Sequence, residues 1–483
     1  MNYSIIVYIL GWVLNIEAAA MLLPCVVALI YGETTQLFSF LITAAVSFII
    51  GLLMHLKKPK NTKFYAKEGF AVVALSWIVI SLVGAVPFVL SGDIPSYISA
   101  LFETVSGFTT TGASILVNVE ALSRGILYWR SFSHWVGGMG VLVFLLALAP
   151  GGKKNEGFTM HLFRAESPGP EVGKLVPKLR QTALYLYGTY IVLSLLNFAF
   201  LMFGDMNWFE ALCTMFGTAG TGGFGVRGDS IGSFSPYIQN VTTVFMLLFG
   251  VNFSCYYLII LGQFRSVIRD EELRLYFCIV AVSIALITWN IADMYDTFGE
   301  GLRHAAFQVA SIISTTGFST VDFDLWPSFS KGILIVLMVT GACAGSTCGG
   351  MKCARVLLLF KGLRRNIRQM LHPQRVEVVR VNGRAVDEKV MSGVNGYLSA
   401  YVLIVFLSFA VISLDGFSIG TNFSAVLACF NNIGPGFEAV GPVMNFSNYG
   451  ILSKLVLTFD MLAGRLEIFP MLLFFAPGSW RRA

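Results

Sequence analysis

Long apolar segments recur along the whole chain, and they constrain its fold more than any other feature. Each is about 20 residues long, the length that an α-helix needs to cross the hydrocarbon core of a bilayer. The chain is 56% hydrophobic and only 12% charged, whereas soluble domains average about 25% charged residues. The pattern excludes a soluble protein. It predicts an all-α polytopic membrane protein, because the runs do not alternate as strands of a β-barrel do.

Most of the 33 lysine and arginine residues gather in five places between the apolar segments. These clusters are Lys57–Lys67, Lys153–Arg180, Arg265–Arg274, Lys361–Lys389 and Arg481–Arg482. By the positive-inside rule all five face the cytoplasm, so an even number of crossings must separate consecutive clusters. The sequence then predicts ten crossings with both termini in the cytoplasm. The predicted spans are Ile5–Ile30, Leu37–Met54, Gly69–Leu90, Tyr128–Leu148, Ala183–Phe203, Val241–Leu261, Tyr276–Ala292, Ile333–Phe360, Tyr397–Leu414 and Ile451–Phe475.

Each of the last four pairs of spans encloses an outer connection that begins apolar and then turns to glycine and threonine. The four connections are Ala100–Ser114, Trp208–Gly225, Ala305–Thr320 and Ala425–Phe437. Their apolar parts are about ten residues long, too short to span a bilayer, and fit re-entrant half-helices. Their Gly-Thr parts cannot face lipid, because unpaired backbone groups are costly in hydrocarbon. They are therefore expected inside the protein or beside a water-filled cavity.

The unit of helix, half-helix, glycine-rich return and helix thus occurs four times. An internal repeat on this scale predicts four pseudo-fourfold helix–pore-loop–helix repeats around a central pore, plus an extra N-terminal helix pair. The predicted units are the helix pair at residues 1–56 and the pore repeats at 68–150, 181–263, 274–361 and 395–478.

Four inward loops around one axis would surround a dehydrated cation with carbonyl oxygens, which replace its hydration shell. Glycine permits close approach of the backbone, and threonine hydroxyls add oxygen ligands. Ordinary extracellular turns are the other interpretation, which four loops in register disfavour. In the second loop Thr221, Gly222 and Gly223 are taken as the counterpart, because Gly223–Phe224 matches Gly317–Phe318, and Gly220 and Gly222 are the alternatives. In the fourth loop Gly436 is the alternative to Gly434. The candidate filter residues are Thr110, Thr111, Gly112, Gly220, Thr221, Gly222, Gly223, Thr315, Thr316, Gly317, Asn432, Ile433 and Gly434.

Acidic residues lie on or near the predicted outer side, where we expect a mouth that concentrates cations, although a solvated rim would give the same pattern. They are Asp93, Glu103, Asp205, Glu210, Asp229, Glu300, Asp322 and Asp324. Within the first apolar segment, Glu17 is costly in lipid, so we expect it at an interface or a protein contact.

The span after the third loop contains a run of small residues, Gly341–Lys352 (GACAGSTCGGMK). Such a run would break a membrane helix and form a flexible barrier beneath the filter, and close helix packing through small residues is the alternative. Lys352 and Arg355 are expected at the cytoplasmic interface. The candidate gate residues in this run are Gly345, Ser346, Thr347, Gly349 and Gly350.

Arg465 is the remaining gate candidate, because it lies well inside an apolar span, where a charge is expensive and usually functional. We expect it near the pore, where it would hinder cation passage electrostatically. The alternative is a structural pair with Glu467 or with a carbonyl group.

These motifs resemble those of the Trk/Ktr/HKT superfamily of potassium transporters over essentially the whole chain. Gly341–Lys352 is similar to the break that the family places in the second helix of its third repeat. Gly464–Pro470 (GRLEIFP) resembles the arginine-bearing motif of its last helix, and Trp135–Gly140 (WVGGMG) the first-repeat counterpart. The extra N-terminal helix pair points to the membrane subunits of bacterial Trk systems rather than to the eight-helix Ktr branch.

The resemblance implies K⁺ as the transported ion, the bacterial inner membrane as the location, membrane lipid as the surroundings and a homodimer as the assembly. It also implies a separate cytosolic, TrkA-like regulatory subunit that binds NAD(H) or adenine nucleotides. The basic loop Lys361–Lys389 is a candidate docking surface for that subunit, or for lipid headgroups. No nucleotide site is predicted on this chain, because Gly222–Gly223 lack the Lys-Ser/Thr of a phosphate loop. No nucleic-acid partner is predicted.

The predicted function is potassium uptake through a single-chain selectivity filter, gated by the intramembrane run and by the cytosolic subunit. The alternative is a cation-coupled secondary transporter of a small solute, which predicts two inverted halves; four like-oriented modules argue against it. An enzyme is not predicted, because the five histidines are scattered. The residues leave open whether uptake is channel-like or coupled to H⁺ or Na⁺. Unequal loops predict some Na⁺ or Rb⁺ passage.

Overall fold

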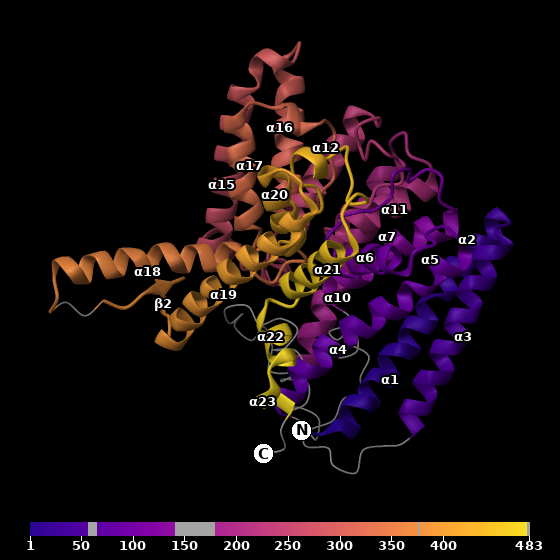
Figure 1. Cartoon of the computed structure of the whole chain (residues 1–483). Helices are drawn as coiled ribbons and strands as arrows, with labels where there is room; N and C mark the ends of the chain where they lie inside the picture. Colours follow the sequence, from indigo (N-terminus) through magenta and orange to yellow (C-terminus); the bar gives the residue numbers. More distant parts are fainter. Residues whose placement is uncertain (57–64, 141–178, 375–376, 481–483) are drawn as a thin grey trace.

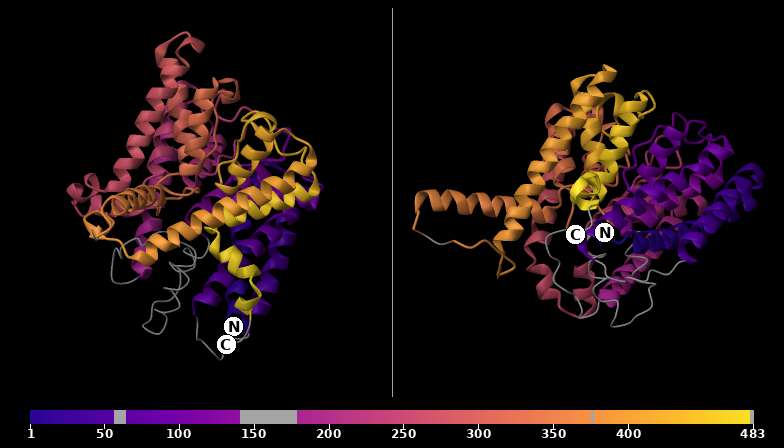
Figure 2. Two further views of the ribbon diagram at one scale, coloured as in Figure 1. Left: turned by 60° about the vertical axis from the view of Figure 1, so that its left-hand side comes forward. Right: turned by 60° about the horizontal axis from the view of Figure 1, so that its bottom comes forward.

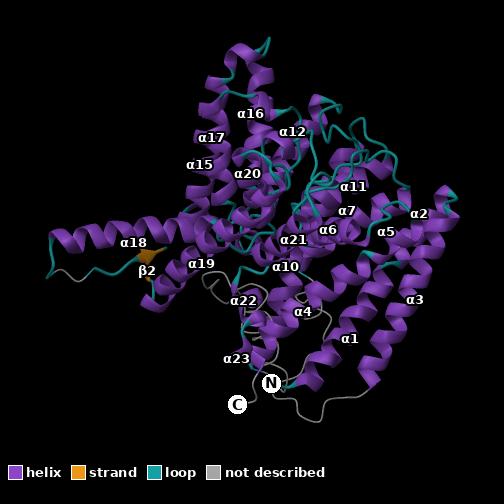
Figure 3. Cartoon of the chain, in the orientation of Figure 1, coloured by secondary structure: helices purple, strands orange, loops and turns teal. Residues whose placement is uncertain are grey.

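A computed structural model describes residues 1–56, 65–140, 179–374 and 377–480 of the chain. Figure 3 shows that helices make up nearly all of the regular structure. The two ends of the described chain lie together at one side of the molecule (Figure 1). There the Tyr3 hydroxyl donates to the Trp480 carbonyl at 3.1 Å, and the two rings stack with centroids 6.3 Å apart.

The N-terminal part consists of α1 (Tyr3–Ala20), α2 (Leu22–Tyr31) and α3 (Thr34–Leu56). Met21 joins α1 to α2, so the two helices together form one apolar segment of 29 residues, Tyr3–Tyr31. Glycines allow α1 and α3 to pack closely, since a Cβ added to Gly11 would lie 2.8 Å from the Gly51 carbonyl oxygen. The pair packs against α4 and α7 of the next group of helices.

Four similar groups of helices follow. The first contains α4 (Ala66–Gly84), α5 (Val86–Ser91), α6 (Tyr97–Phe108) and α7 (Arg124–Met139). The second contains α10 (Leu179–Met202), α11 (Trp208–Gly220), α12 (Pro236–Phe249) and α13 (Phe253–Ile260). The third contains α15 (Glu271–Asn290), α16 (Phe298–Ile313), α17 (Ser328–Thr340) and α18 (Cys353–Leu371). The fourth contains α19 (Glu388–Ile412), α20 (Ile419–Phe430), α21 (Ile451–Arg465) and α22 (Phe469–Phe475).

Short elements complete the described chain. Helix α14 (Phe264–Ile268) precedes α15, and α23 (Pro477–Trp480) closes the chain. Strands β1 (Arg380–Val381) and β2 (Arg384–Ala385) form an antiparallel hairpin in which Arg380 pairs with Ala385. The 3-10 turns are η2 (Ala292–Met294), η3 (Phe323–Leu325), η4 (Ser413–Asp415) and η5 (Glu438–Val440).

The four groups pack in a cyclic order. The helix that follows each loop contacts the short half-helix of the next group: α7 contacts α11, α12 contacts α16, and α17 contacts α20. Helix α21 of the last group contacts α6 of the first, which closes the ring. The views in Figure 2 agree with this arrangement, since the yellow C-terminal helices lie beside the indigo and purple N-terminal ones. This packing brings the four loops to the middle of the molecule.

Within the described residues, six helices are long and apolar enough to cross a membrane, or seven if the bent pair α12–α13 counts as one span. The predicted continuous spans Val241–Leu261 and Ile451–Phe475 are interrupted, whereas the break at Gly341–Lys352 occurs where the small residues predicted it. Helices α12 and α13 meet at 88°, residues 341–352 separate α17 from α18, and α21 ends before α22 begins. The last residues of the predicted span Tyr128–Leu148 lie outside the described part. Each break contains glycine or residues with positive φ: Gly250 between α12 and α13, Gly341 between α17 and α18, and Glu467 and Ile468 between α21 and α22. Average hydropathy does not reveal such positions.

Large apolar side chains cover the outer faces of several long helices. Leu53 on α3, Leu195 on α10 and Leu403 on α19 are each about 60% exposed or more. Because no water-soluble surface would carry so many, these faces are suited to lipid. Helix α18 differs, since it extends away from the body of the molecule (Figure 1) and carries both basic residues and the exposed Phe360 and Met370.

Candidate ion pathway

The four half-helices α6, α11, α16 and α20 end in the same backbone pattern. In each loop a non-glycine residue adopts the left-handed conformation, and a glycine with positive φ follows two positions later. The left-handed residues are Thr110, Thr221, Thr315 and Asn432, all with φ of 54° or 55°. The glycines are Gly112, Gly223, Gly317 and Gly434, with φ between 78° and 99°. Only glycine adopts such a φ readily, so the backbone supports the alignment based on Gly223 and Gly434. Gly436 lies outside this pattern.

The same glycines approach the neighbouring loop very closely. A Cβ added at each would meet the carbonyl oxygen of the residue that precedes the next loop's glycine. The pairs are Gly112 with Gly222 at 2.1 Å, Gly223 with Thr316 at 1.9 Å, Gly317 with Ile433 at 1.9 Å, and Gly434 with Thr111 at 2.8 Å. These contacts form a closed cycle. The structure therefore brings the predicted loop residues together in one ring and places the carbonyls of Thr111, Gly222, Thr316 and Ile433 at equivalent positions.

Gly220 does not belong to this ring. It is the last residue of α11, and a Cβ there would lie 2.2 Å from the His134 carbonyl oxygen on α7. Its role in the structure is close helix packing. The hydroxyl groups of Thr111 and Thr316 are engaged within their own loops. Thr111 Oγ1 forms a hydrogen bond with Thr109 Oγ1 at 2.8 Å, and Thr316 Oγ1 forms one with Ser314 Oγ at 2.7 Å.

Two other side-chain oxygens at the first loop position have no partner within the described chain. They are the Thr110 Oγ1 and the Asn432 Oδ1, both in fully buried residues. The amide nitrogen of Asn432 is occupied, because it donates to Thr111 Oγ1 and to the Met461 carbonyl, both at 2.9 Å. Buried oxygens are normally satisfied, so each of these two can accept a further hydrogen bond.

A cavity of about 120 Å³ opens beside the ring and is lined by all four positive-φ glycines. The charged residues among its described lining are Arg130 and Arg227, so the predicted acidic mouth is wrong for this cavity. Two of the predicted acids pair with these same arginines: Glu103 with Arg130, and Glu210 with Arg227. They brace the loops that surround the cavity.

Glu438 shows the same bracing in the outer part of the fourth group. Its carboxylate accepts hydrogen bonds from the Ser418 hydroxyl, the Thr421 hydroxyl at 2.9 Å and the Thr421 N–H at 3.1 Å. The bonds from Ser418 and Thr421 hold the pKa of Glu438 below its ordinary value, against the opposing effect of burial.

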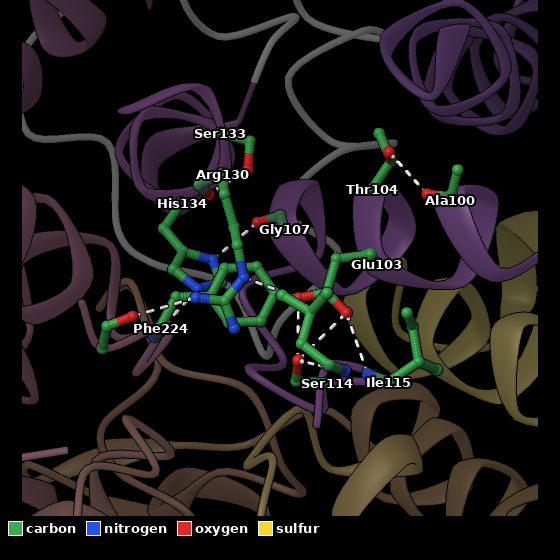
Figure 4. A network of polar contacts seen from close by, with 12 residues as sticks. Ala100, Glu103, Thr104, Gly107, Ser114, Ile115, Arg130, Ser133, His134 and Phe224 are labelled. Atoms are coloured by element: carbon green, nitrogen blue, oxygen red, sulfur yellow. Dashed lines mark hydrogen bonds and ion pairs between the residues drawn. The ribbon is translucent and has the colours of Figure 1, made fainter. Parts of the chain in front are cut away.

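Arg130 and Glu103 form a buried ion pair behind the first and second loops (Figure 4). Arg130 Nε donates to Glu103 Oε1 at 2.6 Å. Glu103 also accepts hydrogen bonds from the Ser114 hydroxyl and the Ile115 N–H, in the segment that follows the first filter glycine. The guanidinium carbon of Arg130 lies 3.5 Å from the centre of the Phe224 ring. One pair thus holds segments that follow two different filter glycines.

His134 makes a second link between the same loops (Figure 4). Its Nε2 accepts from the Phe224 N–H at 3.2 Å, so its Nδ1 carries the proton and donates to the Gly107 carbonyl at 2.7 Å. The imidazole is buried. It therefore connects half-helix α6 to the second loop as a neutral group.

Residues 341–352, which we call the intramembrane loop, contact residues that precede the filter glycines, whereas the 120 Å³ cavity is lined by those glycines and by residues that follow them. The Gly349 N–H donates to Thr315 Oγ1 at 2.7 Å, and the Thr221 hydroxyl donates to Thr347 Oγ1 at 3.4 Å. A Cβ on Gly349 would lie 2.5 Å from the Asn431 carbonyl oxygen. The loop thus contacts the second, third and fourth filter segments, and Gly345 and Gly350 both have positive φ. The sequence left two interpretations of this run, a broken helix and close packing through small residues. The structure shows both, because the helix is interrupted and its glycines pack closely against neighbouring backbone.

Arg465 connects the intramembrane loop to the first group. It donates to the Thr347 carbonyl at 2.7 Å, to the Gly138 carbonyl at 2.6 Å and to the Gly137 carbonyl. Of the two structural partners considered for Arg465, the carbonyl group is realised in these contacts. Glu467 forms an ion pair with Arg355.

The sequence predicts Lys352 and Arg355 at the cytoplasmic interface, but in the structure both side chains are buried. Their exposed fractions are 8% and 5%. Lys352 Nζ donates to the Cys348 carbonyl at 2.6 Å, and Arg355 stacks on the Tyr397 ring at 4.0 Å. Both cations fix the intramembrane loop and the start of α18 against the fourth group.

Sequence reasoning did not identify Arg130 and His134 as parts of this site. A signal for Arg130 existed, because it lies in the apolar span after the first loop, where a charge needs a partner. His134 carried no comparable signal, since a single buried histidine is compatible with ordinary packing.

Comparison with known proteins agrees with this architecture. Residues 36–482 match the family model TrkH, described as a cation transport protein. The Trk system potassium uptake proteins TrkH and TrkG of Escherichia coli K12 are 35% and 34% identical, with 100% and 99% of both chains covered. The crystal structure of the potassium transporter TrkH from Vibrio parahaemolyticus superposes with a TM-score of 0.89 at 31% identity, covering 100% of each chain. The chain belongs to the TrkH family of cation transport proteins.

Proposed function

We propose that this chain takes up potassium ions across a membrane through a pore whose selectivity filter is the ring of four loops. The observation that carries the proposal is the closed cycle of glycine-to-carbonyl contacts, which sets four equivalent carbonyls around one axis. Rings of carbonyl oxygens replace the hydration shell of K⁺. Relatives at 34–35% identity over nearly the whole chain are named potassium uptake proteins, which supports potassium as the ion.

The electrostatics of the half-helices favour a cation at the ring. Helices α6, α11, α16 and α20 all end at the loops, so their C-terminal, partially negative ends meet there. Thr110 and Asn432, in the first and fourth loops, carry further oxygens without a partner in the described chain. Together these groups would stabilise a dehydrated cation without any formal negative charge.

The intramembrane loop is the proposed gate. It contacts three of the four filter segments, and Arg465 ties it to α7 through carbonyl groups. A pathway through the ring would have to pass this loop, and the guanidinium would oppose a cation there. Release of these contacts would open the path.

The remaining parts of the proposal concern surroundings and partners. We propose residence in the bacterial inner membrane with both termini in the cytoplasm, pore-repeat boundaries at 68–150, 181–263, 274–361 and 395–478, and a homodimer. A cytosolic, TrkA-like subunit that binds NAD(H) or nucleotide would act on the gate, since α18 continues directly from the intramembrane loop. On α18, the exposed Arg364 and the half-buried Lys361, Arg365 and Arg368 offer a docking surface.

The test is ⁸⁶Rb⁺ uptake into liposomes that contain purified protein, with unlabelled K⁺ or Na⁺ as competitor. Gly112→Ser and Gly317→Ser place a side chain against a neighbouring carbonyl at 2.1 and 1.9 Å. Gly92→Ser is the matched control, because Gly92 has a similar φ of 82° and nothing within 4 Å of an added Cβ.

We expect wild-type uptake that K⁺ suppresses better than Na⁺, loss of uptake or of this preference in both filter variants, and retention in the control. Equal uptake in Gly317→Ser and the control would place the filter elsewhere. Absence of wild-type flux, with and without the cytosolic subunit, would refute ion conduction.

A further inference from the structure

A second cavity lies away from the ion pathway, between the N-terminal helices and the first and second groups. Its volume is about 370 Å³, within the roughly 300–1,000 Å³ of small-molecule sites. Its lining comes from α1, α4, α6, α7 and α10 and is almost entirely apolar. The aromatic residues that line it are Phe108, Trp129, Phe132, Trp135 and Tyr187.

Glu17 of α1 lines this cavity and has no assigned role. Only 5% of it is exposed, and neither carboxylate oxygen has a hydrogen-bond partner in the described part of the chain. A Cβ added to Gly84 would lie 3.2 Å from Glu17 Oε1 and 2.9 Å from the Phe108 ring. The carboxyl group therefore sits where α1, α4 and α6 meet. Burial of an unpartnered carboxylate is costly, and a donor or cation brought by a ligand would offset that cost.

The other polar side chains of the described lining are already engaged. The indole N–H of Trp129 donates to the Gly84 carbonyl at 3.1 Å, and that of Trp135 donates to Ser194 Oγ at 3.2 Å. The Tyr187 hydroxyl donates to the Gly140 carbonyl at 2.8 Å. The groups available to bind a ligand in this cavity are thus one carboxyl group and the faces of several aromatic rings. Aromatic faces attract cations as well as apolar groups.

We propose that this cavity binds a hydrophobic ammonium compound, that is, one protonated amine on an apolar body. The ammonium group pairs with the Glu17 carboxylate, and the body packs among the aromatic rings. A neutral molecule of the same shape fills the space but brings no cation to the carboxyl group. Phe108, the last residue of α6, lies in the lining and immediately precedes the first filter segment. The site is therefore positioned to influence that half-helix, although its existence does not depend on the proposed potassium filter.

The experiment measures binding of 4-phenylbutylammonium to the purified full chain in lipid nanodiscs by isothermal titration calorimetry. The neutral analogue 4-phenyl-1-butanol has the same body without the charge, and protein-free nanodiscs correct for partition into lipid. We expect saturable binding of the amine to wild type. Glu17→Gln should weaken amine binding by at least about tenfold, through loss of a charge-assisted hydrogen bond, and leave alcohol binding unchanged.

A second variant tests the cavity without altering the carboxylate. Ala20 lines the cavity, and Ala20→Phe would fill it, so both compounds should lose binding. The Asp293→Asn variant removes an exposed acid instead and should bind as wild type does. Equal amine affinity in wild type and Glu17→Gln, undiminished binding in Ala20→Phe, or no binding above protein-free nanodiscs would each overturn the proposal.

Discussion

The buried ion pair between Glu103 and Arg130 permits a quantitative test of how the loops are held. The two side chains are 0% and 3% exposed and 2.6 Å apart, so solvent screens them little. In Glu103→Gln, the amide oxygen can still accept from Ser114 and Ile115, but Arg130 remains as a buried charge without its partner. Such removal of one partner typically costs about 3–5 kcal/mol. We expect the free energy of unfolding to fall by that amount.

The double variant Glu103→Gln with Arg130→Met separates the pair from its surroundings. With both charges gone, the total loss should be smaller than the sum of the single losses, with a coupling energy of about 2–3 kcal/mol. Arg227→Met is the matched control, because Arg227 is 34% exposed in its pair with Glu210 and such pairs contribute only about 0.2–1 kcal/mol.

Reversible unfolding in sodium dodecyl sulfate measures these values, and ⁸⁶Rb⁺ uptake measures the filter's integrity in parallel. The single variants at position 103 or 130 should also lose uptake, since the pair positions segments after two filter glycines. A loss below about 1 kcal/mol in Glu103→Gln, or additive losses in the double variant, would refute the reasoning.

Three further predictions concern the gate. Arg465→Gln weakens the donors that hold the intramembrane loop to α7 and should raise ⁸⁶Rb⁺ uptake; unchanged uptake with reduced folded yield would indicate a purely structural role. Thr315→Val leaves the Gly349 N–H without its acceptor, at a cost of about 1–3 kcal/mol, so the thermal midpoint should fall; an unchanged midpoint would contradict this bond. Glu467→Gln leaves Arg355 buried without its partner and should destabilise the start of α18, seen as faster amide hydrogen exchange there.

Much of the fold followed from two patterns in the sequence. Apolar length revealed the long helices, and glycine after a short apolar run revealed the filter segments, because positive φ strongly favours glycine at Gly112 and Gly317. The choice of Gly223 and Gly434 in the less regular loops also agrees with the backbone. These features are local, so they are visible in a single chain.

The contacts between distant segments could not be predicted in this way. Hydropathy treats Val241–Leu261 as one continuous span, yet the chain bends by 88° between α12 and α13. Likewise, the sequence suggests that Glu103 is an acidic residue at the outer rim. In the structure it is buried and pairs with Arg130, 27 positions away. Pairing between buried charges depends on how helices pack, and a residue's type and depth do not specify its partner.

The most direct test of the central claim is a diffraction structure of the protein with Rb⁺ in place of K⁺, using the anomalous signal of the ion. We expect a Rb⁺ peak on the axis of the ring, coordinated by the carbonyl oxygens of Thr111, Gly222, Thr316 and Ile433. Loss of that peak in Gly317→Ser, with the peak retained in Gly92→Ser, would link the ion to this geometry. A peak only at another place, or none at the ring when Rb⁺ is transported, would contradict the account.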